Sequence, residues 1–413
     1  MASVDELIRQ LETGTRKQRR QAAATLGELG DPKAVPALLR TLQDEDEELF
    51  VREHAAHSIG KIGDLNAVPE LLDAYEGRPF DIKKPILRAI GEILSRTSPD
   101  DDHSRKIFSV TVDWLIQRIA QYGKWEINSE RDAAAVEALG KSRDPKAIPV
   151  LVEHLLDDDR PAVATSAAFG LRHFNDPQVI HALIQAATNK NIPIDAREAA
   201  VKSLGDIGNP NAVDTLISIL EDSSDEETAR SDAARALGRI GDPKAIEPLI
   251  RTLKNEGNSS AVSLRAAIAE ALGAFRDPRV IDALIGTLTD YYYTAHAASE
   301  SLKKLRDPRA VESLISILDD GTKNALEREF AAQILGVIAD PRAIPVLVNA
   351  LRDDDEDIRE EARKSLQSFV LTHPDAILRI APDDRNLLGR QIQDAERDEL
   401  LEEVCVELFI EDY

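Results

Sequence analysis

The chain has 413 residues and a formal net charge of −24, with 43% hydrophobic but only 4% aromatic residues. This acidity argues against nucleic acid and anionic membrane as partners. It favours a partner protein with a basic surface, or it simply keeps an elongated surface soluble. The single cysteine, Cys405, excludes an intramolecular disulfide and any cysteine-built metal site within one chain. With no signal peptide in "MASVDELIRQ" and no bilayer-spanning apolar run, we expect a cytoplasmic protein without a membrane span.

A repeat runs through the chain from near the N-terminus. The strings "GDPKAVPALLRTL" (30–42) and "GDPKAIEPLIRTL" (241–253) are nearly identical. An Asp or its equivalent, often followed by Pro, marks each copy. The markers are Asp31, Asp64, Ser98, Asp144, Asp176, Asn209, Asp242, Asp277, Asp307, Asp340 and His373, and one interval, from Ser98 to Asp144, is unusually long.

Each repeat predicts two helices joined by an acidic loop. The Asp caps the first helix, and the prolines, including Pro36, Pro69, Pro149 and Pro345, fit only within its first turn. An apolar stripe at helical spacing follows, for example Val35, Leu38, Leu39 and Leu42. The second helix carries the pattern A-A-x-x-L-G, in which small residues allow close helix packing. Its glycine, such as Gly238, fits a helix C-cap.

The first break in the pattern is a lengthened repeat at 98–143, which contains both tryptophans. A longer first helix is expected to carry Phe108, Val112, Leu115, Ile116 and Ile119 as its apolar stripe. Trp114 lies at the edge of that stripe, and Tyr122 and Trp125 fall in the following loop. These aromatics either cover the longer helix or form a protruding contact for a partner protein.

A smaller irregularity lies at 157–177. There Ala164 takes the place of a recurrent arginine, and Leu171-Arg172 takes the place of Leu-Gly. We interpret it as local variation.

The next break is "YYYTAHAASE" at 291–300. The repeat is shortened here, and three tyrosines replace an acidic loop, while Ala295 replaces the arginine and Lys303 the glycine. Either two rings seal the shortened corner and one lies on the surface, or Tyr291, Tyr292 and Tyr293 form a recognition patch with His296.

The chain closes with an acidic segment, 375–413, which is expected to form a helical cap over a repeat region at 1–374. Leu400, Leu401, Val404 and Leu408 have helical spacing, with Cys405 beside them. A docking segment ending in "ELFIEDY" is the alternative.

These motifs resemble HEAT repeats, in particular the short class named after phycobilisome lyases. The resemblance covers about residues 15–375 and implies an all-α fold, a right-handed α-solenoid of about ten to eleven helical pairs. It also implies a cyanobacterial source. In HEAT repeats an arginine near the start of the second helix typically pairs with a loop aspartate, forming a ladder. The matching residues are Arg19, Arg52, Arg197, Arg230, Arg265, Arg328 and Arg359.

No nucleotide-binding or nucleophile motif is present in the sequence. His54 and His57 share one helix face, but the His-Glu dipeptides of HEAT-like di-iron hydroxylases are missing, so no metal or other cofactor is expected. We expect a non-catalytic scaffold that binds a partner protein on its concave face, which the resemblance sets in phycobilisome or photosynthetic-complex assembly. The resemblance leaves open two alternatives: a bilin lyase or bilin-binding chaperone, and a partner of an IscA-type iron–sulfur carrier.

Overall fold

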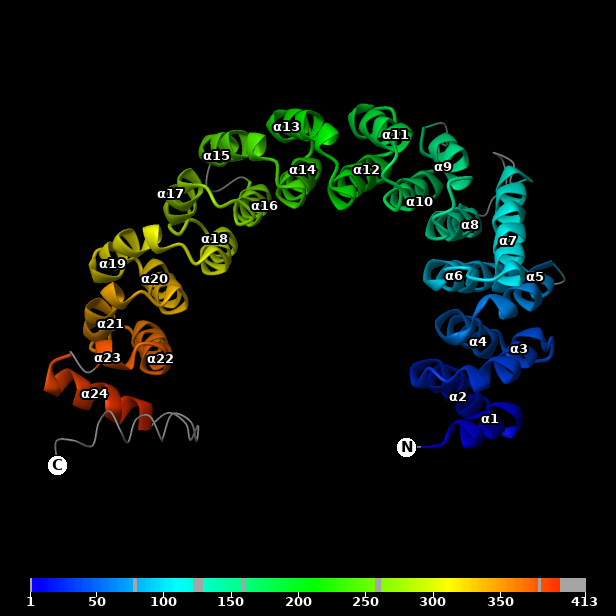
Figure 1. Cartoon of the computed structure of the whole chain (residues 1–413), viewed down its shortest axis with the longest axis horizontal. Helices are drawn as coiled ribbons and strands as arrows, with labels where there is room; N and C mark the ends of the chain where they lie inside the picture. The colour runs from blue at the N-terminus through cyan, green and yellow to red at the C-terminus, as the bar shows by residue number, and fades with distance from the viewer. Residues whose placement is uncertain are drawn as a thin grey trace. The chain divides into compact units, whose positions relative to one another are not determined.

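The computed structural model describes residues 2–76, 80–121, 129–156, 160–256, 261–377 and 380–393. Helices and short 3-10 turns make up the regular structure in those ranges, which contain no strand. The helices form two compact units, Met1–Ala212 and Val213–Tyr413 (Figure 1). This arrangement confirms the expected all-α solenoid. None of the helices in these ranges is both long and apolar enough to cross a bilayer.

Unit 1, Met1–Ala212, contains six helical pairs. Its first helices are α1 (Val4–Thr13), α3 (Val35–Gln43), α5 (Val68–Glu76), α7 (Asp102–Gln121), α9 (Ala147–Leu156) and α11 (Pro177–Thr188). Its second helices are α2 (Arg16–Leu29), α4 (Leu49–Ile62), α6 (Phe80–Arg96), α8 (Ser129–Lys141), α10 (Pro161–Leu171) and α12 (Ile194–Ile207).

Unit 2, Val213–Tyr413, contains five further pairs in its described part. Its first helices are α13 (Val213–Glu221), α15 (Ile246–Asn255), α17 (Pro278–Gly286), α19 (Val311–Asp319) and α21 (Ile344–Ala350). Its second helices are α14 (Glu227–Ile240), α16 (Val262–Leu272), α18 (Tyr292–Leu305), α20 (Ala325–Ile338) and α22 (Glu356–Thr372). Two shorter helices, α23 (Pro374–Ile377) and α24 (Pro382–Gln393), follow.

The Asp-Pro motif starts the first helices as expected. In the first copy, the Asp31 carboxylate accepts a hydrogen bond from the Lys33 backbone N–H at 2.9 Å. A 3-10 turn over Pro32–Ala34 then leads into α3, where Pro36 lies in the first turn and needs no N–H partner.

The lengthened repeat begins later than the sequence indicated. Helix α7 starts at Asp102, and the Asp101 carboxylate accepts the backbone N–H groups of His103 and Ser104 at 2.8 and 2.9 Å. Asp101, not Ser98, is therefore the helix-start residue. Of the predicted stripe, Val112, Leu115 and Ile119 are buried, and Phe108 and Ile116 are half-buried.

The glycine of A-A-x-x-L-G is not a C-cap, contrary to expectation. Gly238 lies inside α14, and the left-handed cap is Gly241, with φ of +72°. A Cβ added at Gly238 would lie 2.7 Å from the Ala271 Cα atom of the next second helix. The glycine is therefore required for close helix approach, and its role in the backbone is secondary.

Serine hydroxyls tie the second helices together at the same contacts. Ser58, Ser203, Ser301 and Ser365 each donate to a backbone carbonyl of the preceding second helix, at 2.7 to 2.9 Å. Second helices therefore pack more closely than first helices within each unit, which curves each unit toward its second-helix row (Figure 1).

This close packing makes a testable prediction. Replacing Gly238 with Ala should lower the stability of unit 2 by about 1–3 kcal/mol, because the new methyl group meets a backbone atom. The sign of the stability change is informative, because helix propensity alone would make Ala about 1 kcal/mol more stabilising than Gly. Thermal unfolding followed by circular dichroism measures the change. Gly321→Ala, at a position with no neighbour within 4 Å, is the control and should be neutral or mildly stabilising. A raised melting temperature for Gly238→Ala would contradict the packing role.

Candidate functional site

The three tyrosines stand at the start of α18 in unit 2. Tyr291 is the N-cap residue, and Tyr292 and Tyr293 form the first turn. Their side chains are 57%, 55% and 73% exposed, respectively. The alternative in which two rings seal the corner is therefore wrong, because all three rings lie on the surface.

The rings form a connected surface with His296, which we call the aromatic patch (Tyr291, Tyr292, Tyr293 and His296). The Tyr292 ring centroid lies 5.8 Å from those of Tyr293 and His296. Beneath them, the buried Phe330 ring of α20 lies 6.3 Å from both Tyr292 and His296. The next repeat thus supplies a buried apolar ring beneath the patch.

The patch occurs where two second helices are held apart. At α18, Lys303 stands in the place of the packing glycine, and Ile334 of α20 takes the place of the small residue opposite. As a result, α18 and α20 approach each other less closely than the other neighbouring second helices of unit 2. The wider spacing leaves room for the buried ring of Phe330 at this interface.

The loop before the tyrosines retains an acidic residue, Asp290, although the sequence pattern predicted that the tyrosines replace the acidic loop. The Asp290 carboxylate is buried and accepts from the Arg265 guanidinium, with Nε at 2.9 Å. The ladder breaks one step later, because Ala295 occupies the next arginine position and is fully buried. The aromatic patch therefore lies beside an intact arginine–aspartate pair of the ladder, Arg265 and Asp290.

One carboxylate lies beside the patch on α18, and others lie close together on α20 and α22. Burial, together with the charges of Glu361, Asp357 and Asp355, raises the pKa of Glu329, the neighbour of Phe330 in the chain. On α18, Glu300 lies 4.0 Å from the His296 ring and also pairs with Lys303. Exposed aromatic faces and carboxylates are a combination that suits cationic side chains.

The tryptophan region is less exposed than the tyrosines. Trp114 on α7 packs edge-on against the buried Tyr75 of α5, with ring centroids 5.1 Å apart, and its indole N–H donates to Glu76 at 3.2 Å. Arg118 covers the outer face of the indole ring. Trp114 thus joins two first helices, as the covering interpretation expects. Tyr122 and Trp125 lie outside the described residues.

The seven ladder arginines hydrogen-bond to backbone carbonyls or loop carboxylates. The ion pairs shown join Arg19 to Glu47, Arg230 to Glu256, Arg265 to Asp290 and Arg328 to Asp353. Arg52, Arg197 and Arg359 donate to the backbone carbonyls of Leu42, Ala187 and Asp353, respectively.

A typical rung joins three segments. Arg328 Nε donates to the Leu318 carbonyl at the end of the preceding helix, at 3.0 Å, and Nη1 donates to the Asp353 carboxylate of the next repeat, at 3.2 Å. Each such arginine therefore ties its own repeat to the following one, which is a structural role.

One rung is inverted. At the arginine position of α8 stands Asp132, whose side chain is only 1% exposed. It accepts from Arg131 at 3.0 Å and from Arg160, in the loop of the next repeat, at 2.5 Å. Here the acid lies on the helix and the arginine in the loop.

Within the part of the chain that the structure describes, the two histidines of α4 belong to no group that could hold a metal ion. The His54 ring Nε2 accepts from Arg20 Nε at 3.1 Å. Burial and the charge of Lys61 lower the pKa of His57. No group of three or more His, Cys, Asp or Glu side chains within the described ranges could hold a metal ion.

The inverted rung can be tested by a double-mutant cycle. Asp132→Asn and Arg160→Gln should each destabilise unit 1, by up to about 3–5 kcal/mol for the loss of a buried partner. The double variant should lose less than the sum of the two, because the residues share one interaction. Urea denaturation measures all three. The exposed Lys33–Asp5 pair is the control, and Asp5→Asn should cost less than about 1 kcal/mol. Strict additivity would show that Asp132 and Arg160 do not stabilise each other.

Acid stability provides a second test. Burial opposes ionisation of Asp353, but hydrogen bonds from Arg328 and the Asp355 N–H outweigh it and hold its pKa below the ordinary value. Its contribution to stability is therefore present above the unfolded pKa of about 3.9 and is lost as pH falls through the lower folded pKa. Asp353→Asn should destabilise unit 2 at pH 7 by about 1–3 kcal/mol and flatten the decline between about pH 5 and 2. The exposed Asp354→Asn is the control. An unchanged pH profile in Asp353→Asn would contradict this assignment.

Comparisons with known proteins agree with this architecture. HEAT repeats match residues 4–91, 111–172, 154–231, 193–259, 224–302, 257–326, 288–367 and 322–400. No curated protein matches the chain.

Solved structures show the fold alone. Kap95p, in a complex with RanGDP, has a TM-score of 0.55 at 14% identity, covering 99% of this chain and 56% of its own. The CpcE–CpcF complex of phycocyanin lyase from Nostoc sp. PCC7120 has a TM-score of 0.35 at 24% identity, covering 59% of this chain and 94% of its own. YibA of E. coli has a TM-score of 0.41 at 20% identity, covering 66% and 99%. From the repeat matches along its length, the chain belongs to the HEAT-repeat family.

Proposed function

We propose that the protein is a non-catalytic scaffold whose aromatic patch binds a basic surface of a partner protein. The observation that supports this most directly is the exposure of three consecutive tyrosines over a buried phenylalanine. Tyrosine offers a large apolar face and a hydroxyl group at little entropic cost, and it is favoured in binding hot spots.

The surroundings of the patch support a basic partner in particular. Lysine and arginine side chains stack on tyrosine rings, and the carboxylate of Glu300, beside His296, can pair with them. The net charge of −24 would also attract such a partner over longer distances. The Trp114 region is the second predicted contact, although Trp114 already serves the α5–α7 interface. Phycobilisome or photosynthetic-complex assembly remains a prediction from the resemblance.

The proposal is tested by replacing Tyr291, Tyr292 and Tyr293 together with alanine. Affinity for proteins captured from host lysate should fall at least tenfold, about 1.4 kcal/mol, with helix content unchanged. Phe50→Ala is the control, because Phe50 is also exposed (52%) but lies in unit 1 beneath Arg20. Capture should weaken as salt rises, since charge contributes to it.

Three outcomes would count against this function. Equal capture by the triple variant would remove the aromatic patch from binding, and salt-independent capture would remove the electrostatic argument. Co-purification of a phycobiliprotein with bilin bound would favour the lyase or chaperone alternative over a non-catalytic scaffold.

A further inference from the structure

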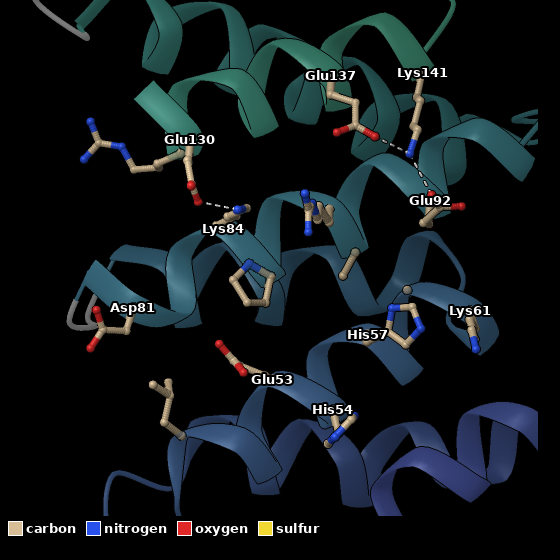
Figure 2. A pocket seen from close by; sticks show the side chains of 16 residues that line it. Glu53, His54, His57, Lys61, Asp81, Lys84, Glu92, Glu130, Glu137 and Lys141 are labelled. Carbon is tan, nitrogen blue, oxygen red and sulfur yellow. Dashed lines mark hydrogen bonds and ion pairs between the residues drawn. The ribbon is translucent and has the colours of Figure 1, made fainter. Parts of the chain in front are cut away.

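A pocket of about 680 Å³ lies on the second-helix row of unit 1, over α8, α10 and α12. It shares Lys84, Arg88, Glu130 and Glu137 with a larger pocket over α4, α6 and α8, which is shown in Figure 2. The middle of its lining comes from α10, the second helix of the irregular repeat at 157–177. The pocket belongs to unit 1, so it is separate from the aromatic patch of unit 2.

The pocket follows from short side chains on α10. Three positions of each second helix supply much of the lining: two residues before, one after and five after the ladder position. On α10, where Ala164 holds the ladder position, they are Ala162, Thr165 and Phe169. On the two neighbouring helices, five of the six equivalent residues are charged: Glu130, Glu137, Asp195, Glu198 and Lys202. Uncharged residues on α10 thus form a floor between two charged walls.

The charges of the walls largely neutralise one another. Three lysine–glutamate pairs account for most of them: Lys84–Glu130 at 2.5 Å, Lys141–Glu137 at 2.8 Å and Lys202–Glu198 at 3.7 Å. Figure 2 shows the first two pairs, on α6 and α8. The hydrogen bond from Lys84 and the charge of Arg88 both lower the pKa of Glu130. The walls therefore do not select a ligand of one sign of charge.

The floor suits an apolar group. Ala133 and Ala134 of α8 are buried, and Thr165 of α10 is half-buried. At one end lies the half-buried ring of Phe169, on which Arg172 of the same helix already stacks at 5.6 Å. A charged group on this floor would lose its water without gaining a counter-charge there, whereas an apolar side chain would be stabilised by the contact. The size of the pocket is that of an ordinary ligand site.

One charge at the rim stays unpaired. Asp195 is exposed in the first turn of α12, and no hydrogen bond or ion pair joins its side chain to another residue in the ranges that the structure describes. An acid at a helix start is favourable in itself, so Asp195 alone does not indicate a ligand. It does decide which charge is accepted beside the floor, because a basic side chain would gain a partner and an acidic one would be repelled.

The spacing of floor and rim matches an extended segment. Asp195 and Ala162 have the same register on neighbouring helices, which places them about 8–10 Å apart. In an extended chain, residues two positions apart lie about 7 Å apart and point to the same side. A lysine or arginine that follows an apolar residue by two positions can therefore reach Asp195 while the apolar side chain occupies the floor.

We propose that this pocket takes one large apolar side chain of an extended partner segment, and that Asp195 pairs with a lysine or arginine two residues from it. Regular repeats carry charged residues at these positions and cannot form such a floor. The contact lies on unit 1 and does not rest on the function proposed for the aromatic patch.

The experiment selects random phage-displayed peptides of about ten residues on the full chain. Peptides that also bind the Ala162→Glu variant are removed by counter-selection. Glutamate is the residue of α8 at this position, and Ala162 is exposed, so the variant should fold. Both chains carry the aromatic patch, so its ligands are removed in the same step. The recovered peptides should share a large apolar residue with Lys or Arg two positions away.

Two phenylalanine variants then assign the binding to the pocket. Phe169→Lys introduces the residue that α12 carries at this position and should weaken binding of the recovered peptides about tenfold, measured by fluorescence anisotropy. Phe50→Lys makes the same change at an exposed phenylalanine of α4 outside the pocket and should change affinity less than about twofold. Circular dichroism checks that both variants fold.

A double-mutant cycle tests the contact at the rim. Asp195→Asn should weaken binding about threefold, as expected of an exposed ion pair. It should have no effect on a peptide whose basic residue is replaced with Gln, because the two changes remove the same interaction. Asp46→Asn, at an exposed loop position of unit 1, is the control and should leave affinity unchanged.

The proposal would be overturned if no peptide survived counter-selection, or if the survivors shared no large apolar residue. Equal losses from Phe169→Lys and Phe50→Lys would also overturn it, since the effect would then not come from the pocket. Equal effects of Asp195→Asn on peptides with and without the basic residue would contradict the pairing at the rim. None of these outcomes depends on the tyrosines of unit 2, so this test and that of the proposed scaffold function can fail independently.

Discussion

The close approach of neighbouring second helices is the constraint on which the rest of the structure depends. It needs a glycine on one helix and a small residue on the next, as at Gly60 and Ala89 or Gly238 and Ala271. Packing at this distance buries the alanine-rich helix faces and allows serine hydroxyls to reach carbonyls across the interface. Because a core of small side chains provides little apolar area per residue, such backbone-level contacts carry much of the stability of each unit.

The arginine ladder adds specificity to this packing. Each rung contacts a helix end in its own repeat and, where the pairing is intact, a carboxylate one repeat later, so the rungs fix the register of successive repeats. The inverted rung at Asp132 shows that the repeat accepts either order of charges at this place. Buried pairs of this kind contribute more to a defined arrangement than to net stability.

Much of the fold could be predicted from the sequence because most repeats carry their own signal for the start of the first helix. The Asp-Pro turns, the apolar stripe and the Arg positions recur, and recurrence made them readable. The predictions were wrong where the role of a residue depends on a neighbour from another repeat. Gly238 resembled a cap because its helix continues by only two residues, and its true partner, Ala271, is one repeat away. Phe330, which lies beneath Tyr292, also belongs to the next repeat and has no signal in the sequence around the tyrosines.

The absence of a ladder arginine at Ala295 also affects how unit 2 resists force and local unfolding. In a solenoid, force and local unfolding pass from repeat to repeat through nearest-neighbour interfaces, so the interface with the fewest ties yields first. The α18–α20 interface has neither the packing glycine nor a rung from Ala295. Unit 2 therefore has a compliant joint beside its aromatic patch. A partner held on α18 that also touched α20 would brace this joint, so that binding and stiffness of the unit become coupled.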